Sequence, residues 1–244
     1  MSNTENRNTM AQSSFGDLEK TIIINNLMST PFEQRDQHWR KEFLDNIAGA
    51  NLKLGNPEVI MSNDNFPYFQ LETISAGENF QAIVIQHQLD TILEQGFGVA
   101  INPQAGRPDW VFSYGDLLNL KANNEFYTDH SVFSNPKEYQ SIGKDEDILV
   151  GQPSEAILPA VLRQHLREFL QHSGVKNPKV MLIARNYTDE EKASQDLVFN
   201  MIPAQFAHEK DFEQIMSSIR WFLPKHYSFF GVDEMSIENG FMPL

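Results

Sequence analysis

The stretch Gly96–Leu120, which reads GFGVAINPQAGRPDWVFSYGDLLNL, decides the expected fold of the first half of the chain. Two short apolar runs, Phe97–Ile101 and Trp110–Ser113, flank a connector rich in turn-forming residues, Asn102–Asp109. Apolar runs separated in this way predict two strands joined by a turn. A helix is expected to follow from Asp116 to about Asn123. Strand, turn, strand and helix is therefore the local structure that we expect here.

The residues before this stretch predict further helices and strands of a mixed α and β domain. Trp39, Phe43 and Ile47 recur at helical spacing, while Arg35 and Arg40 fall mostly on the opposite face. Alternating and β-branched segments favour strands, and Gly96 is placed to end a short helix. The expected elements are a helix from about residue 31 to 54, strands at 58–61, 67–73 and 80–85, and a helix at 86–95.

The second half predicts the order β-α-β-β-α-β, with Ser154 as the cap of its first helix. This order is typical of the split β-α-β, ferredoxin-like fold, in which two helices cover one face of an antiparallel sheet. The expected strands are 148–151, 179–185, 196–202 and 227–232, and the expected helices are 154–172 and 208–222.

These patterns together predict an α+β protein of two small domains, since a chain of 244 residues is long enough for two. We expect residues 1–30 to be a polar, largely disordered N-terminus, although Ile22–Ile24 within it suit either a strand or a helix. The expected units that follow are an N-terminal α+β domain at 31–125, a linker at 126–147 and a C-terminal ferredoxin-like domain at 148–244.

Composition excludes several classes of function. The chain has no cysteine, which excludes disulfides, thiol catalysis and zinc–thiolate sites. Its formal net charge is −14, so that nucleic acid and anionic membranes are not expected as partners. The N-terminus has no apolar segment typical of a secretion signal, and no apolar run is long enough to span a membrane. We expect a cytoplasmic protein of unknown oligomeric state whose partners are proteins.

Sequence motifs of catalysis and cofactor binding are missing. The seven histidines form neither an HExxH motif nor another zinc-binding spacing. No nucleophile elbow, phosphate-binding loop or dinucleotide fingerprint occurs. We therefore expect no catalytic residues, no metal and no cofactor.

One cluster of chemically capable side chains remains, at the tip of the Gly96–Leu120 stretch. It contains a guanidinium group, two carboxylates and two aromatic rings, which could hold a small polar ligand or a partner protein. The same residues also have a structural explanation. An aspartate can close the turn, a tryptophan can pack in the core, and an aspartate is favourable in the first turn of a helix. The candidate binding residues are Arg107, Asp109, Trp110, Tyr114 and Asp116.

Several phrases of the sequence resemble the SseB family, which is named for enhanced serine sensitivity and has N- and C-terminal SseB-type domains. The resemblance rests on Gly96–Pro103 (GFGVAINP) in the first half. In the second half it rests on Ile148–Ser154 (ILVGQPS), which leads to Leu158–Leu162 (LPAVL). It covers roughly residues 33–232 and implies a bacterial cytoplasmic protein without established catalytic residues.

Two hypotheses about function follow. The first is a non-enzymatic interaction or regulatory protein that resembles the SseB family. The second is a small-ligand binder or an enzyme whose site lies in a cleft between the domains, near Arg107, Asp109 and Asp116. A deep polar pocket around these three residues would favour the second hypothesis. A flat apolar patch would favour the first.

Overall fold

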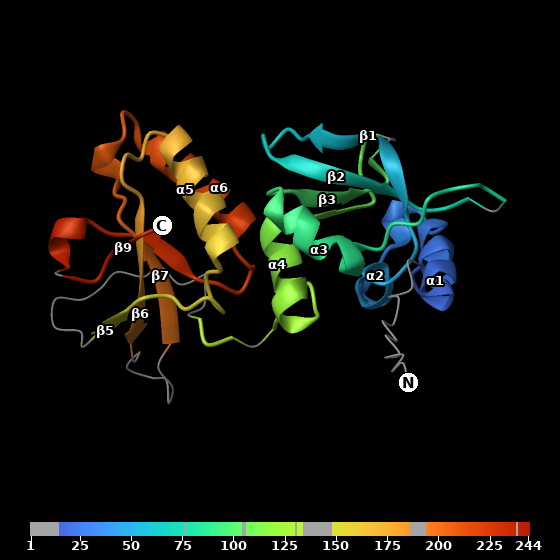
Figure 1. Ribbon diagram of the computed structural model, residues 1–244, viewed down its shortest axis with the longest axis horizontal. Coiled ribbons are helices and arrows are strands. Elements are labelled where there is room, and N and C mark those ends of the chain that lie inside the picture. The colour runs from blue at the N-terminus through green and yellow to red at the C-terminus, as the bar shows by residue number, and fades with distance from the viewer. Residues whose placement is uncertain are drawn as a thin grey trace, which may run out of the picture.

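The computed structural model describes residues 15–75, 77–103, 106–129, 131–133, 148–185, 194–237 and 239–244. It is a mixed α+β structure with two separate sheets, of four and five strands. The helices of the first half gather on one side of its sheet, and two helices of the second half lie between the second sheet and the first half (Figure 1).

The first half begins with helix α1 (Leu18–Met28), which lies within the segment expected to be largely disordered. That expectation is wrong for these residues. Asp17 caps the helix by accepting hydrogen bonds from the first amides, and Ile24 is buried in the core. The Trp39 indole also donates to the Leu27 carbonyl oxygen at 2.9 Å. Residues 1–14 lie outside the described part of the chain.

The first sheet has the strand order β1-β2-β3-β4. Antiparallel pairing joins β1 to β2 and β3 to β4, whereas β2 and β3 are parallel and connected through α3. The elements are the short 3-10 turn η1 (Phe32–Gln34), α2 (Gln37–Ile47), β1 (Lys53–Met61), β2 (Pro67–Glu72), α3 (Ile85–Glu94), β3 (Gly98–Ile101), β4 (Trp110–Phe112) and α4 (Tyr114–Asn123). The expected strand–turn–strand–helix stretch is therefore present.

The strand expected at residues 80–85 is a wrong prediction. Ile83 forms only an isolated bridge with Leu52, and Ile85 already begins α3. Only Ile85 of the β-branched run belongs to this helix, where Ile85, Leu89 and Ile92 recur at helical spacing and are all buried.

The second sheet has the order β5-β6-β7-β8, with β9 also beside β6. Its elements are β5 (Ile148–Gly151), α5 (Ala160–His172), β6 (Lys179–Arg185), β7 (Ser194–Phe199), the 3-10 turn η3 (Pro203–Gln205), α6 (Glu209–Phe222), β8 (Phe229–Gly231), the 3-10 turn η4 (Glu234–Ser236) and β9 (Met242–Pro243). The predicted β-α-β-β-α-β order along the chain is present. Ser154 does not cap α5, because Pro159 precedes the first helical residue and Ser154 closes a turn before it.

The ferredoxin-like arrangement of these strands is nevertheless wrong. A split β-α-β unit needs its first two strands parallel, with another strand between them. Here β5 and β6 are direct neighbours and run antiparallel. The order of elements along the chain does not fix the order of strands across the sheet, because a helical connection can return the chain beside different neighbours.

The two halves share one topological unit. In α2-β1-β2-α3-β3, a helix precedes an antiparallel hairpin, and a second helix leads to a strand parallel to the hairpin's second strand. The unit α5-β6-β7-α6-β8 has the same connections and pairings. The chain is therefore built on a structural repeat, to which each half adds different edge strands.

A continuous apolar core joins the halves. Phe66 of the first half stacks on Trp221 of α6, with ring centroids 4.1 Å apart. The Trp221 indole donates a hydrogen bond to the Tyr68 hydroxyl at 2.7 Å. A single buried cluster includes residues of both sheets. Burial of these large rings fixes how the halves meet.

Candidate functional site

The candidate site lies where helix α2 meets strand β4. Asp36 caps α2 by accepting a hydrogen bond from the Trp39 amide at 2.9 Å. The buried face of α2 then places Phe43 against the Trp110 ring, with centroids 5.2 Å apart, and Trp39 lies 6.2 Å from the same ring. Aromatic packing thus brings the beginning of α2 beside the turn between β3 and β4.

Asp109 is fixed on both of its carboxylate oxygens. Oδ1 pairs with Arg35 Nη2 at 2.7 Å, and Oδ2 accepts from Asn102 Nδ2 at 2.7 Å. Asn102 is held in turn, since it has a φ of 50° and its Oδ1 accepts the Thr73 amide at 2.8 Å. Asp109 therefore closes the turn and positions Arg35, and its charge is already compensated.

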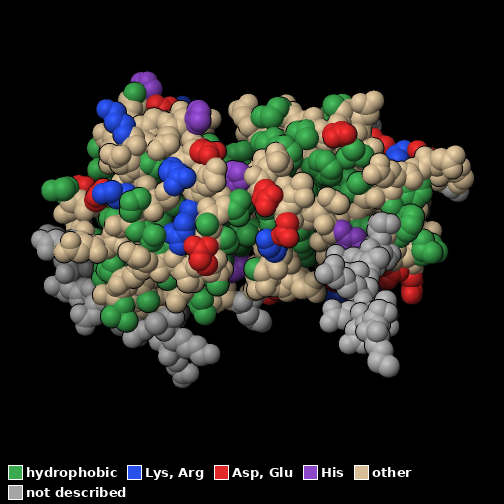
Figure 2. All heavy atoms as spheres, viewed as in Figure 1, with side chains coloured by type: hydrophobic (Ala, Val, Ile, Leu, Met, Phe, Trp, Pro, Cys, Tyr) green, Lys and Arg blue, Asp and Glu red, His purple; other side chains and the backbone are tan. Residues whose placement is uncertain are grey.

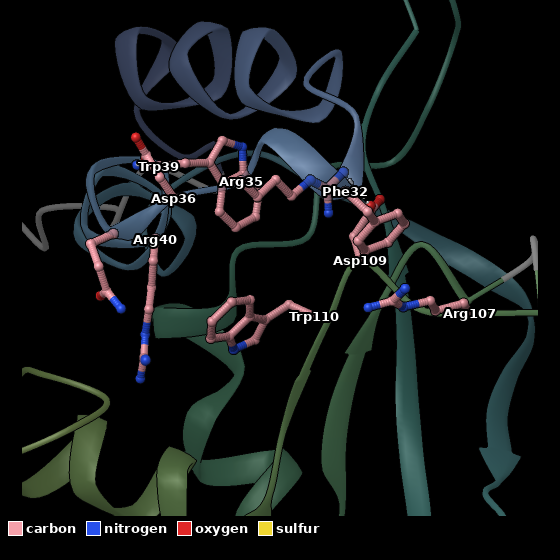
Figure 3. A pocket seen from close by; sticks show the side chains of 9 residues that line it. Phe32, Arg35, Asp36, Trp39, Arg40, Arg107, Asp109 and Trp110 are labelled. Atoms are coloured by element: carbon pink, nitrogen blue, oxygen red, sulfur yellow. Dashed lines mark hydrogen bonds and ion pairs between the residues drawn. The ribbon is translucent and has the colours of Figure 1, made fainter.

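A pocket of about 470 Å³ opens at this junction (Figure 3). We call it the Arg–Trp pocket. It combines three arginines, two aspartates and three aromatic rings. Its lining residues are Phe32, Arg35, Asp36, Gln37, Trp39, Arg40, Arg107, Asp109 and Trp110.

Arg35 forms the wall of the pocket rather than an open binding group. Its side chain is only 9% exposed. The guanidinium lies 4.0 Å from the Phe32 ring centroid and 4.6 Å from that of Trp39, and its Nε donates to the Thr30 carbonyl oxygen. These contacts and the Asp109 pair hold the group in one place.

Arg40 and Arg107 are the two arginines that the pocket presents to solvent. Arg107 lies over the Phe32 ring at 4.3 Å, and Arg40 lies 5.8 Å from the Trp110 ring centroid. In Figure 3 the two guanidinium groups lie on either side of the Trp110 indole. Within the described ranges, neither guanidinium has an acidic partner. Both charges are thus available to an anion.

The charge of the Arg–Trp pocket contrasts with that of the whole chain. Three of the chain's eight arginines line it, although the formal net charge of the protein is −14. Its two acids are both occupied, because Asp109 pairs with Arg35 and Asp36 caps α2. Elsewhere, on the face shown in Figure 2, acidic and basic side chains are interspersed over the C-terminal half, on the left. The Arg–Trp pocket is therefore a positively charged region on a protein whose net charge is negative.

Tyr114 and Asp116 lie in a different environment from the other candidate residues. Tyr114 is fully buried between the halves, 5.5 Å from the His165 ring centroid, and burial raises the pKa of its hydroxyl. Asp116 is 1% exposed and forms a capping box with Ser113 at the start of α4. Asp116 thus lies in the first turn of its helix, as its structural interpretation predicts, and Tyr114 is a buried packing residue.

Asp116 also makes an ion pair across the interface. Its Oδ1 lies 3.5 Å from Lys225 Nζ. Burial raises the pKa of the Asp116 carboxyl, against the opposing effects of Lys225 and the Ser113 hydrogen bonds. The Arg–Trp pocket includes Arg107 and Asp109 but not Asp116, which lies buried at the interface.

Sequence reasoning missed six of the nine residues that line the pocket, namely Phe32, Arg35, Asp36, Gln37, Trp39 and Arg40. The two arginines had been recognised only as the polar face of a helix. A local signal existed in the alternation of arginines with Phe32 and Trp39, but nothing in the sequence connected it with Trp110. That connection needs the packing of α2 on β4.

No three histidine, aspartate or glutamate side chains among the described residues converge as metal ligands would. No helix in the same ranges has both the length and the apolar character needed to cross a membrane.

Comparison of the chain with known proteins found no matching family, no similar curated protein and no similar solved structure.

Proposed function

We propose that this protein is a non-enzymatic interaction protein in which the Arg–Trp pocket binds an anionic group of its partner. The observation that carries the proposal is the pair of exposed guanidinium groups, Arg40 and Arg107, which lack acidic partners among the described residues. Arginine binds carboxylate and phosphate groups through planar, charge-assisted hydrogen bonds. Arginine and tryptophan are also the residue types that contribute most strongly to binding at interfaces.

Other features of the site support binding rather than catalysis. The pocket's two acids are engaged in turn closure and helix capping, so neither is free to act as a general base. The chain has no cysteine, and the described part has no cluster of metal ligands. The resemblance to the SseB family, which implies a bacterial cytoplasmic protein, supports the same role. A small-ligand binder or enzyme that uses this pocket is the alternative, favoured by its volume of about 470 Å³.

The three tryptophans provide a test. Trp39 and Trp110 line the pocket, whereas Trp221 is buried between the halves. We propose to titrate ¹⁵N-labelled protein with succinate, a small dicarboxylate, at low ionic strength and to follow the three indole N–H signals. The expected result is a saturable shift of the Trp110 signal with no change at Trp221. Affinity in the millimolar range, on the order of 1 mM, is sufficient for this measurement.

Charge-matched variants complete the experiment. Arg107→Ala should abolish the shift, while Lys210→Ala on α6, which removes the same charge in the other half, should leave it unchanged. Equal shifts at all three indoles, or an undiminished response of Arg107→Ala, would refute anion binding at this pocket. Turnover of a small carboxylate by the wild type, lost in Arg107→Ala, would favour the enzymatic alternative.

A further inference from the structure

The Arg–Trp pocket continues into a second hollow. This hollow has a volume of about 890 Å³ and shares Gln37 and Arg40 with the pocket. Helix α2 also contributes Lys41, Leu44 and Asp45 to it. Side chains at these spacings lie on one face of a helix. We call the two hollows together the α2 groove, since they follow the outer face of α2 from its first turn to its last.

The length of the groove suits an extended chain better than a small molecule. An α-helix of 11 residues, such as α2, is about 16 Å long at roughly 1.5 Å per residue. An extended peptide advances about 3.3–3.6 Å per residue, so that about five residues span this length. Small-molecule sites commonly have volumes of about 300–1,000 Å³, and the two hollows together exceed this range.

Charge changes along the α2 groove. The first hollow presents Arg107 and Arg40, whose charges are uncompensated by described residues. The second hollow adds two cations, Lys20 and Lys41, of which Lys41 pairs with Asp45 at 2.5 Å. Its far wall, formed by the segment after α4, adds Glu125 and Asp129, both exposed. The groove is therefore cationic at one end and mixed to acidic at the other.

The middle of the groove offers apolar and aromatic surface. Tyr127 lies beside Arg40, whose guanidinium is 5.4 Å from the tyrosine ring centroid. The Trp110 ring centroid lies 5.8 Å from the same guanidinium. Leu44 adds aliphatic surface from α2. An aromatic side chain at the centre of a bound segment could stack against these groups.

We infer that the α2 groove binds an extended segment of a partner protein with acidic residues at one end, an aromatic residue in the middle and basic residues at the other end. The acidic side chains pair with Arg107 and Arg40, and the basic ones face Glu125 and Asp129. This inference rests on the proposed function, because it takes anion binding at the Arg–Trp pocket as its starting point. It adds the class and the length of the partner segment.

Charge also argues against a nucleic acid in this groove. A nucleic acid carries uniformly spaced phosphates, which would meet Asp45, Glu125 and Asp129 in the second hollow. The net charge of −14 would repel a long polyanion at every approach. A peptide segment that is acidic at one end and basic at the other meets side chains of opposite charge at both ends of the groove.

The test uses fluorescein-labelled hexapeptides and fluorescence anisotropy on the full chain. The probe is DDFSKK, used together with its reverse KKSFDD because the direction of the segment is open. Controls of the same length are DDFSDD and a six-nucleotide oligothymidine. The expected result is that one of the mixed peptides binds about tenfold or more tightly than DDFSDD and the oligonucleotide.

Two variants probe the junction between the hollows and the second hollow. Arg40→Ala, at the junction, should weaken binding of the mixed peptide about tenfold, whereas Lys210→Ala should not. Asp129→Lys should weaken the mixed peptide and strengthen DDFSDD, because it replaces one negative charge of the second hollow by a positive one and leaves the first hollow unchanged. Asp129 makes no side-chain hydrogen bond or ion pair among the described residues, so this exchange should leave the fold intact.

The outcomes separate this inference from the proposed function. If succinate shifts the Trp110 signal but the mixed peptides bind no more tightly than DDFSDD, the pocket binds anions and the peptide groove is refuted. Unchanged affinities in Asp129→Lys would refute it as well. Tighter binding of oligothymidine than of any peptide would overturn the choice of a protein partner. If the wild type responded neither to succinate nor to any of the peptides, the proposed function itself would be refuted.

Discussion

At the scale of single residues, Asp109 has a structural role that can be measured. Its carboxylate is 16% exposed and neutralises Arg35, whose side chain is 9% exposed. Asp109→Ala would leave that guanidinium largely buried without a counter-charge and would free the Asn102 amide. We expect a loss of about 2 kcal/mol in the free energy of unfolding, measured by urea denaturation.

A second ion pair provides the control for this prediction. Asp90 pairs with Lys121 at 2.6 Å, but both side chains are exposed, by 78% and 49%. Asp90→Ala should cost less than about 1 kcal/mol, because solvent screens exposed pairs. Equal losses in the two variants would show that Asp109 is no more important to the fold than a surface aspartate.

Asp116 predicts a particular dependence of stability on pH. Its pKa in the folded protein is raised above the ordinary value of 3.8, first of all by burial. As pH rises above 3.8, the unfolded chain releases this proton before the folded protein does, so the contribution of Asp116 to stability falls. The carboxyl stabilises the fold most in its protonated form, in spite of Lys225 nearby.

Asp116→Asn isolates this effect, because the amide keeps the shape of the side chain and does not titrate. We expect the stability of the wild type relative to Asp116→Asn to decline between about pH 4 and neutral pH. Urea denaturation of both proteins across this range provides the measurement. A relative stability that increases with pH would mean that the Lys225 pair outweighs the cost of burying the charge.

The sequence predicted the candidate site only in part, for a physical reason. Arg107, Asp109 and Trp110 belong to one strand–turn unit, and local turn chemistry places them together. Tyr114 and Asp116 follow closely in sequence, but the first turn of α4 carries them into the interface. Arg40 joins the pocket only because Phe43 packs on Trp110, a contact between distant segments.

At the scale of elements, helix α4 meets the second half at Gly115. A β-carbon built on Gly115 would lie 2.1 Å from the Leu223 carbonyl oxygen, which is backbone and cannot turn aside. We expect Gly115→Ala to destabilise the protein by about 1–3 kcal/mol, the range of overpacking in a core. Alanine's better helix propensity, about 1 kcal/mol, would offset only part of this cost. Denaturant unfolding provides the measurement.

Gly151, in strand β5, is the matched control for this exchange, because a β-carbon there has no neighbour within 4 Å. Gly151→Ala should change stability by less than about 0.5 kcal/mol. If Gly115→Ala left the free energy of unfolding unchanged, α4 and the segment after α6 could move apart at no cost in stability. That result would contradict the importance of the close contact between Gly115 and Leu223.

Helices and strands themselves were predicted well where side-chain periodicity was strong. Helix α6 and strands β3, β4, β5 and β6 have nearly the expected bounds. Prediction failed where a short apolar run had two explanations, as at Ile83–Ile85. It failed again for strand order in the second sheet, since pairing between β5 and β6 depends on contacts that no local pattern encodes.

At the scale of the whole molecule, the composition indicated two units, and two sheets are present. Their coupling was not foreseen. No pattern in the sequence connects the rings of Phe66, Tyr68 and Trp221 with one another, because they belong to segments far apart along the chain. Only the structure shows that they meet across the two halves.

This coupling predicts that the chain unfolds in a single transition. Trp221 is 8% exposed, stacks on Phe66 and donates to Tyr68, so Trp221→Ala removes the centre of the interface. We expect a loss of about 3–5 kcal/mol in the free energy of unfolding and separation of the halves' transitions. In this variant the remaining tryptophans, Trp39 and Trp110, both report on the first half, whereas far-ultraviolet circular dichroism reports on both.

Non-coincident fluorescence and circular dichroism transitions in Trp221→Ala, with coincident ones in the wild type, would establish the coupling. Tyr68→Phe is the control, because it keeps the ring and removes only the hydroxyl, which accepts the indole hydrogen bond and donates to Asp64 Oδ2 at 2.6 Å. It should cost about 1–3 kcal/mol and leave the two transitions coincident. Two transitions in the wild type would instead mean that the aromatic interface adds too little energy to bind the halves into one cooperative unit. The α2 groove lies entirely within the first half, so its integrity would then depend on the stability of that half alone.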